Sequence, residues 1–545
     1  MDGERSTPRG RRHLWIAGAA SLGLVGAGLG AWAAFGGEQA PRTGPISASE
    51  VRSAADDFLH AWADGDVDAA ADDTDDAKAA GAALREYQDG AHLAAQDLKP
   101  GTPDGTRVPF SVRAEFRYEG ARAPLTYDSA LTVVRRPGDG EAVVRWQPQV
   151  LHPQLTEGKR LLAQEAGAAP VTPIDRDGHA LDTRAFPSLG PVVDGLRRAY
   201  AKTAGGRPGV ELRLASSAKA GSDAEPPTGT SLLSVPEGAP GRLATTIDPR
   251  VQKVAEREVA LRPDASLVVL KPSTGEILAV ANSRAGGEDT ALEGRLAPGS
   301  TMKMITASLL LEKKIADPDK PHPCPKTASY GGWQFHNVDD FDIAGGTFRT
   351  SFAASCNTAF ITQAGRIADD DLSRQARDVF GIGEHWSVGV PAFDGSVPVE
   401  HAASKAAQMI GQGQVRMNPL TMASVVSTAR TGQFRQPYLV APSVDHRKLA
   451  TARRTLDRGA HAQLKDLLHT VATAGSGAGS MLGLHGDIGA KTGSAEVIGQ
   501  KEPNGWFAAW HDDLAASAVM RRGGRGGESS GPLVGAVLRA VDRGE

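Results

Sequence analysis

Residues 296–314, LAPGSTMKMITASLLLEKK, contain the pattern that decides the fold. Pro298 and Gly299 end an irregular segment, and the apolar residues after them recur at helical spacing, which predicts a helix with a buried face. Ser300 stands at the start of this helix, and Lys303 follows on the same face. The free N–H groups and the dipole of a helix start favour a developing negative charge.

A serine hydroxyl is a poor nucleophile unless a neighbouring group takes its proton, and a lysine with suppressed charge can do so. Ser-x-x-Lys occurs at Ser300/Lys303 and also at Ser216/Lys219. The second pair lies beside a loop rich in Pro, Gly and Ser, so we expect no catalytic function for it. For Ser300 the alternative is a purely structural N-cap.

Two further motifs occur once each in the chain. Ser355-Cys356-Asn357 lies in RTSFAASCNTAFITQAGR, and Lys491-Thr492-Gly493 lies in GDIGAKTGSAEVIG. The residues around the lysine motif predict a strand, followed by two more strands in NGWFAAW (504–510) and LAASAVMRR (514–522). A lysine and hydroxyls at a sheet edge can bind a carboxylate and complete an oxyanion hole.

Other segments predict the elements around these motifs. Pro249 after Asp248 predicts a helix start. Residues 266–282 predict a hairpin, and residues 531–543 predict a closing helix. Trp506 and Trp510 are expected in the core, and Glu496 is expected at the surface or in a structural role.

The order of the three motifs resembles that of the penicilloyl-serine transferase superfamily, which includes β-lactamases and penicillin-binding proteins. The gaps between motifs, together with TTIDPRVQ, STGEILAVAN, IGQG (410–413) and GWFAAW, are similar to class B, transpeptidase-only penicillin-binding proteins. The resemblance covers about residues 244–545. It implies an antiparallel sheet flanked by helices, together with an all-helical part.

The resemblance implies catalytic roles. Ser300 would attack the penultimate D-Ala carbonyl of a peptidoglycan stem peptide, and Lys303 would take its proton. Ser355 would relay a proton to the leaving D-Ala amine, while Asn357 would hold Lys303 and the substrate amide. Lys491 would tune Ser355 and attract the terminal carboxylate.

The resemblance also implies a substrate-binding set, made of Thr492, Gly493 and Ser494. The hydroxyls of Thr492 and Ser494 would bind the terminal carboxylate. The backbone N–H groups of Ser300 and Ser494 would form the oxyanion hole. No metal and no cofactor are required.

The function implied by the resemblance is peptidoglycan cross-linking, because the acyl-enzyme would react with an amine of a neighbouring stem peptide. A β-lactam would acylate Ser300 as a slow substrate mimic. Such proteins usually work beside a separate glycan-polymerising glycosyltransferase. Two alternatives stay open: a hydrolase of the D,D-carboxypeptidase or β-lactamase type, which needs a water-activating group, and a non-enzymatic penicillin sensor.

The N-terminus predicts a membrane anchor. Residues 14–35, LWIAGAASLGLVGAGLGAWAAF, lack charged residues and follow Arg9, Arg11 and Arg12, as expected for a helix that spans a bilayer with a cytoplasmic N-terminus. Residues 1–13 are then a cytoplasmic tail, and the rest lies outside, at the cell membrane. A cleaved signal peptide and a twin-arginine export signal are alternatives.

Two accessory domains are expected before the catalytic domain in a multidomain α+β chain. In residues 48–155, a helical pattern precedes strands in VPFSVRAEFRY, LTYDSALTVVRR and EAVVRWQPQVL, and this part resembles the NTF2-like domain named for MecA. Residues 156–243 show little periodicity. With their IDRDG turn they resemble a shortened dimerisation or pedestal domain.

Composition excludes some functions. The chain has 64 acidic and 60 basic residues, a net charge of −4, which argues against nucleic-acid binding through bulk positive charge. Two cysteines cannot form a multi-cysteine zinc site. Cys324 and Cys356 are allowed to pair in an oxidising compartment, although sequence does not give their distance. The acidic stretch at 64–76 is expected to be a solvated helix face.

Overall fold

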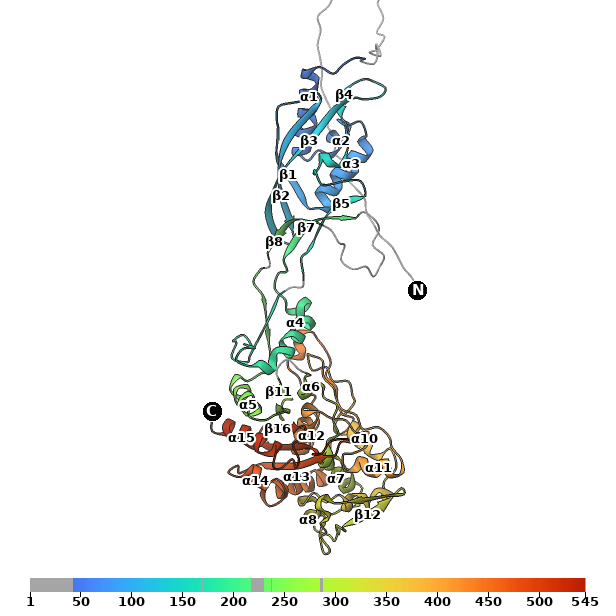
Figure 1. Ribbon diagram of the computed structural model, residues 1–545, viewed down its shortest axis with the longest axis vertical. Helices are drawn as coiled ribbons and strands as arrows, with labels where there is room; N and C mark the ends of the chain where they lie inside the picture. Colours follow the sequence, from blue (N-terminus) through green and yellow to red (C-terminus); the bar gives the residue numbers. More distant parts are fainter. Residues whose placement is uncertain (1–42, 168–169, 217–229, 237, 285–287, 545) are drawn as a thin grey trace, which may run out of the picture. The chain divides into compact units, whose positions relative to one another are not determined.

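The computed structural model describes residues 43–167, 170–216, 230–236, 238–284 and 288–544 (Figure 1). These residues form two units. One comprises the described residues up to 85 with 95–113 and 126–153, and the other comprises 86–94, 114–125 and 154 onwards. The predicted anchor at 14–35 lies outside the described residues. Within the described ranges, none of the helices is long and apolar enough to cross a membrane.

The N-terminal part has helices packed with a four-stranded sheet of order β1-β2-β3-β4. The helix α1 begins with a capping box in which Ser47 and Glu50 satisfy each other's backbone N–H groups. Its buried face includes Phe58 and Trp62, as the helical spacing predicts. Buried and exposed residues alternate along β2, as expected for a sheet with one covered face. The elements are α1 (Ala48–Ala63), α2 (Val67–Asp72), α3 (Ala77–Arg85), a π-helical turn (Glu86–Gly90), β1 (Leu93–Pro100), β2 (Arg107–Tyr118), β3 (Ala121–Arg135) and β4 (Ala142–Val144).

Two strand predictions in this part need correction. The strand expected across 141–151 is only three residues long, because the chain turns into a 3-10 helix at Pro148–Val150. The sequence analysis also missed β1, whose Ala, Gln, Asp and Lys residues have little strand preference. The acidic residues at 64, 66 and 68 are exposed, and Asp66 caps α2.

Residues 156–243 contain two small sheets and a helix. One sheet has the order β5-β7-β8, and the other pairs β6 with β9 in parallel. In the predicted IDRDG turn, Asp175 accepts hydrogen bonds from the N–H groups of Asp177 and His179. The sequence analysis did not predict α4. The elements are β5 (Lys159–Glu165), β6 (Val171–Ile174), a 3-10 turn (Pro187–Leu189), α4 (Gly190–Ala204), β7 (Val210–Ser216), β8 (Thr230–Val235) and β9 (Gly241–Ala244).

The C-terminal part is built on a five-stranded antiparallel sheet of order β11-β10-β16-β15-β14. Its strands are β10 (Ala265–Lys271), β11 (Glu276–Asn282), β14 (Ile488–Ala495), β15 (Asn504–His511) and β16 (Leu514–Met520), which confirms the predicted hairpin and late strands. Trp506 and Trp510 are fully buried, as expected. The edge strand β14 carries the Lys-Thr-Gly motif.

Helices cover both faces of this sheet, and β16 lies between α15 and α12 (Figure 1). The predicted helix at Pro249 is capped by Asp248, and the predicted closing helix is α15. The helices and the remaining hairpin are α5 (Pro249–Ala260), α6 (Thr290–Glu293), α7 (Lys303–Glu312), β12 (Thr327–Tyr330), β13 (Trp333–His336), α8 (Phe348–Ala353), α9 (Thr358–Ile361), α10 (Asp371–Asp378), α11 (Ala402–Met409), α12 (Pro419–Thr431), α13 (Arg458–Thr473), α14 (Ala478–Met481) and α15 (Ser530–Asp542).

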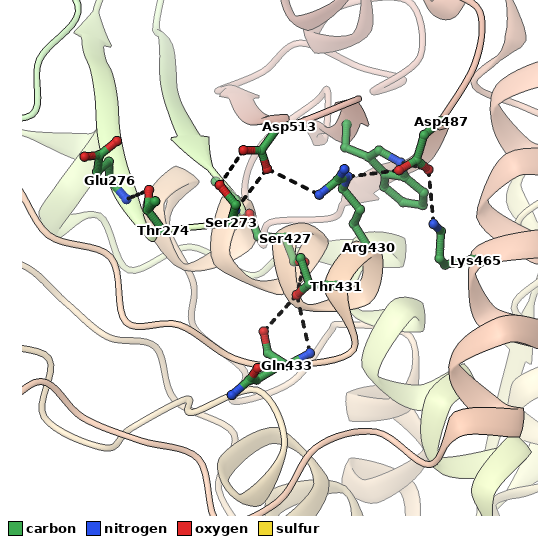
Figure 2. Close-up of polar contacts among 12 residues, drawn as sticks. Ser273, Thr274, Glu276, Ser427, Arg430, Thr431, Gln433, Lys465, Asp487 and Asp513 are labelled. Carbon is green, nitrogen blue, oxygen red and sulfur yellow. Dashed lines mark hydrogen bonds and ion pairs between the residues drawn. The ribbon is translucent and has the colours of Figure 1, made fainter.

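The start of β14 is anchored by a charged network, shown in Figure 2. Asp487, directly before the strand, accepts hydrogen bonds from Arg430 of α12 at 3.1 Å and from Trp510 of β15 at 2.9 Å. Lys465 of α13 lies 3.2 Å from the same carboxylate. Arg430 also reaches Asp513 at 3.3 Å, in the turn between β15 and β16. The edge strand is thereby tied to two helices and to its neighbour.

Candidate active site

Ser300 lies in a 3-10 turn, Gly299–Met302 (η4), directly before α7. The helix therefore begins three residues later than the sequence pattern indicates, because a tighter turn comes first. Pro298 occupies the capping position, and no side chain caps the turn. Ser300 is not an N-cap, so the structural alternative for this residue is wrong. Its side chain is half-buried.

Glycines bring η4 close to β14 and to the IGQG segment. A Cβ atom on Gly299 would lie 2.5 Å from the Ser494 carbonyl oxygen, and one on Gly493 would lie 2.9 Å from the Pro298 oxygen. A Cβ on Gly411 would lie 1.9 Å from the Gly299 oxygen. Only residues without a side chain permit these approaches. Motifs more than a hundred residues apart thus meet through their backbones.

Lys303 is fully buried and has three polar neighbours. Its Nζ lies 3.0 Å from Ser300 Oγ, 2.7 Å from the Ser355 backbone oxygen and 2.7 Å from Asn357 Oδ1. The two oxygens at 2.7 Å can only accept hydrogen bonds. A neutral amine has two N–H bonds, so it would donate both to these oxygens. Its lone pair is then left to face the Ser300 hydroxyl.

Both lysines of the site have lowered pKa values. Burial lowers the pKa of Lys303 well below the ordinary 10.5, and the nearby charge of Lys491 lowers it further. Burial lowers the pKa of Lys491 to about 7. The lowered pKa of Lys303 favours its neutral form, and a neutral amine can accept a proton as a general base must.

Ser355 lies between the two lysines. Lys491 Nζ donates to Ser355 Oγ at 2.8 Å and to the Thr492 carbonyl oxygen at 3.0 Å. Ser355 has a φ of 60°, a left-handed conformation that serine rarely adopts. Surrounding structure must hold such a residue in place, and strained residues cluster at functional sites.

The motif residue between Ser355 and Asn357 forms a disulfide. Cys356 is fully buried and bonded to Cys324, with a Cα–Cα distance of 6.1 Å. Its side chain therefore points away from the polar atoms around Ser300, as its middle position in the motif indicates. The pairing that the sequence left open is formed.

On β14, the Thr492 hydroxyl lies 2.7 Å from the Ser476 hydroxyl, while Ser494 is half-buried. Sequence analysis missed Ser476. It lies in the segment AGSG (474–477) between α13 and α14, which consists of small residues only. A second missed residue is Asn337, which accepts a hydrogen bond from the Asn357 N–H at 2.8 Å. No local pattern distinguishes either residue.

The other candidate residues lie apart from this group. Ser216 ends β7, and Lys219 lies outside the described residues. Glu496 is exposed, as expected. In the part of the chain that the structure describes, no three His, Cys, Asp or Glu side chains are placed to hold a metal ion. The site therefore consists of Ser300, Lys303, Ser355, Asn357 and Lys491, with Thr492, Gly493 and Ser494 along the strand.

Comparison with known proteins gives two family matches. The penicillin-binding protein transpeptidase domain matches residues 265–539, and the NTF2-like N-terminal transpeptidase domain, MecA_N, matches residues 50–159. The peptidoglycan D,D-transpeptidase PbpA of Mycobacterium tuberculosis is 28% identical over 367 residues, covering 56% of this chain and 73% of the relative.

Two solved structures from M. tuberculosis share the fold. Penicillin-binding protein 3 gives a TM-score of 0.55 at 20% identity, covering 70% of this chain and 96% of that chain. Penicillin-binding protein A, as its ceftriaxone acyl-enzyme complex, gives a TM-score of 0.50 at 24% identity, covering 56% of this chain and 81% of that chain. Because the first family match spans half of the chain and contains all three motifs, this protein belongs to the penicillin-binding protein transpeptidases and carries a MecA-type NTF2-like domain before its transpeptidase domain.

Proposed function

We propose that this protein is a peptidoglycan D,D-transpeptidase that cross-links stem peptides through an acyl-enzyme on Ser300. The observation that carries the proposal is the position of Lys303, whose Nζ lies 3.0 Å from Ser300 Oγ and 2.7 Å from two acceptor oxygens. This arrangement supplies the base that a serine nucleophile needs. The 28% identity to PbpA agrees with this reaction.

In the first half of the reaction, Lys303 takes the Ser300 hydroxyl proton as Oγ attacks the carbonyl carbon of the penultimate D-Ala. The N–H groups of Ser300 and Ser494 stabilise the oxyanion. As the peptide bond breaks, Ser355 passes its proton to the leaving D-Ala amine and is reprotonated from the lysines beside it. The acyl group stays on Ser300.

In the second half, an amine of a neighbouring stem peptide attacks the acyl carbon. The amine loses a proton through the same relay, and Ser300 regains its hydroxyl as the new peptide bond forms. Charged Lys491 and the hydroxyls of Thr492 and Ser494 hold the terminal carboxylate of the donor only in the first half, because this carboxylate departs with the released D-Ala. A β-lactam has a comparable carboxylate and a reactive amide, so it acylates Ser300 too.

The context of the reaction is also part of the proposal. Residues 14–35 would anchor the protein in the cell membrane with residues 1–13 in the cytoplasm, so that the catalytic domain meets peptidoglycan outside. Residues 156–243 would serve as the pedestal domain. Because both matched families concern cross-linking, we expect a separate glycosyltransferase to supply the glycan strands.

Labelling with a fluorescent penicillin tests the nucleophile. We expect covalent labelling of the wild type and of Ser216→Ala, the serine of the other Ser-x-x-Lys pair, and no labelling of folded Ser300→Ala. Labelling of Ser300→Ala, or a folded wild type without label, would overturn the proposal.

The fate of the acyl group tests the reaction. With a stem peptide ending in D-Ala-D-Ala and a D-amino acid acceptor, we expect one D-Ala released per exchanged product. Release of D-Ala without exchange, or a penicilloyl-enzyme that hydrolyses within seconds, would instead show a hydrolase.

A further inference from the structure

Asn337 is a polar side chain with no exposed surface, and it lies directly after β13. A buried amide must find hydrogen-bond partners or destabilise the fold. Asn337 Nδ2 donates to the carbonyl oxygens of Pro325 at 3.0 Å and Phe341 at 2.9 Å. Two carbonyls on one side of the amide fix its orientation, because only the NH2 group can face them. The Oδ1 atom must then point the other way.

Asn337 Oδ1 points to the backbone of the Ser-x-Asn motif. It accepts hydrogen bonds from the N–H groups of Asn357 at 2.8 Å and Thr358 at 3.1 Å. The Cys324–Cys356 disulfide adjoins the same contacts, since Asn337 Nδ2 lies 3.2 Å from Cys324 Sγ. One side chain thus connects the segment before the motif, the disulfide and the motif itself.

The neighbouring residue holds the other end of Asn357. Asn357 Nδ2 donates to the His336 carbonyl oxygen at 3.1 Å, so Oδ1 of the same amide faces Lys303 Nζ at 2.7 Å. With the amide turned over, an NH2 group would face the lysine and could not accept its hydrogen bond. The 336–337 segment therefore decides which atom of Asn357 meets Lys303.

We propose that Asn337 is a positioning residue for acylation: it fixes Asn357 and, through it, keeps the lone pair of Lys303 directed at Ser300. Asn337 itself touches neither the nucleophile nor the substrate. The inference rests on the proposed function, since it concerns the step in which Ser300 loses its proton.

The first experiment separates positioning from stability. Asn337→Leu removes the amide at similar volume. Asn418→Leu is the matched control, because Asn418 is also fully buried, donates to the Phe393 carbonyl oxygen at 2.9 Å and accepts from Thr421 N–H at 2.8 Å, but it is the N-cap of α12. Stopped-flow acylation by benzylpenicillin gives the dissociation constant and the acylation rate constant separately.

We expect both variants to lower the melting temperature. Only Asn337→Leu should slow the acylation step, by about 100-fold, since a small misplacement of a catalytic group has an effect of that order. Its penicillin dissociation constant should stay within a factor of about three, because Asn337 has no exposed surface with which to contact the ligand. Asn337→Asp keeps an acceptor for both N–H groups but sets an oxygen against the Pro325 and Phe341 carbonyls, so its rate should lie between those of Asn337→Leu and the wild type.

A double-mutant cycle with Asn357→Ala supplies the second readout. If Asn337 acts through Asn357, Asn337→Leu should change the acylation rate little once Asn357 is already alanine, while its effect on melting temperature remains. Asn337→Ser replaces it in the cycle where the leucine variant does not fold, since a shorter side chain cannot reach both N–H groups.

Three results would overturn the inference: a normal rate for folded Asn337→Leu or Asn337→Ser, an equal slowing by Asn418→Leu, or additive effects in the cycle. These outcomes differ from failure of the proposed function. That failure would appear as labelling of Ser300→Ala, whatever the Asn337 variants do.

Discussion

Lys303 and Lys491, both fully buried, contact two different atoms of one serine. Lys303 Nζ lies 2.7 Å from the backbone oxygen of Ser355, and Lys491 Nζ lies 2.8 Å from its hydroxyl oxygen. Two buried amines this near to each other resist being charged together, because like charges disfavour each other where water is excluded. The site is therefore built to keep one lysine neutral and the other charged.

The rate of acylation should depend on pH with a maximum. At low pH Lys303 becomes protonated and cannot accept the Ser300 proton, although its lowered pKa delays this. Above about pH 7 the free enzyme loses the charge on Lys491, which in the proposed function attracts the substrate carboxylate. We expect the second-order acylation constant for benzylpenicillin to fall on both sides of this pH maximum, because the constant reports the ionisation of the free enzyme. A profile that is flat from pH 6 to 9 would contradict this.

Stability should rise with pH because of Lys491. Its pKa is about 7 in the folded protein and about 10.4 in an unfolded chain, so the unfolded chain binds more protons between these values. Lys491→Met removes this dependence. In urea unfolding at pH 6 we expect the variant to be more stable, by at most about 5 kcal/mol, as each pKa unit corresponds to about 1.4 kcal/mol.

The difference in unfolding free energy between Lys491→Met and the wild type should shrink steadily as the pH rises to 9. The same variant should lose acylation, which shows that the stability gain comes from a functional charge. A gap that stays constant with pH would show that Lys491 does not titrate in this range.

A methyl group on Gly493 should slow acylation without unfolding the protein. Its Cβ would lie 2.9 Å from the Pro298 oxygen and 3.1 Å from the Thr301 nitrogen, so β14 and η4 must separate by a few tenths of an ångström. We expect Gly493→Ala to lower the acylation constant roughly tenfold, since catalysis is sensitive to such displacements. The matched control is Gly479→Ala, whose Cβ meets open space. Equal rates for both variants would show that the close approach is unimportant.

Sequence reasoning selected candidate residues that lie together in the structure, because their motifs follow local patterns. Ser300 and Lys303 lie in one turn and the helix after it, and Lys491 to Ser494 lie in one strand, so periodicity and order suffice. The extra 3-10 turn at Ser300 was not visible, because apolar spacing does not separate it from an α-helix. Strand β4 is shorter than expected for a similar reason. The strand-like sequence pattern continues to residue 151, but the strand ends at Val144 and a 3-10 helix begins at Pro148.

The parts that sequence missed depend on contacts between distant segments. Asn337 and Asn357 are 20 residues apart, and Ser476 and Thr492 are 16 apart, each pair joined only by the folded chain. The Cys324–Cys356 bond is another such contact. Spacing gives no distance between two such residues, so their pairing had to await the structure.

The disulfide should contribute strongly to stability. It closes a loop with a sequence separation of 32, for which the chain-entropy relation gives about 3–4 kcal/mol. We expect a reducing agent to lower the melting temperature of the wild type and to leave that of the Cys324→Ser/Cys356→Ser variant unchanged. Acylation per folded molecule should also slow in both, since Cys356 adjoins Ser355 and Asn357. An unchanged melting temperature on complete reduction would refute this.

The network around Asp487 should support β14 through charge. Burial alone would raise the pKa of Asp487, but the Trp510 hydrogen bond and the charges of Lys465 and Arg430 outweigh it and lower the pKa. Asp487→Asn should cost about 1 kcal/mol of unfolding free energy at pH 7, as expected for partly exposed ion pairs. The loss should vanish as the pH falls below 4 and through the lowered pKa of Asp487, because the wild-type carboxylate is then protonated and loses the same interactions.

The control is Asp512→Asn, which changes an exposed carboxylate in the β15–β16 turn and should alter stability by less than about 0.5 kcal/mol at either pH. A loss that persists at pH 2 would mean that the Asp487 contacts act through shape and not through charge.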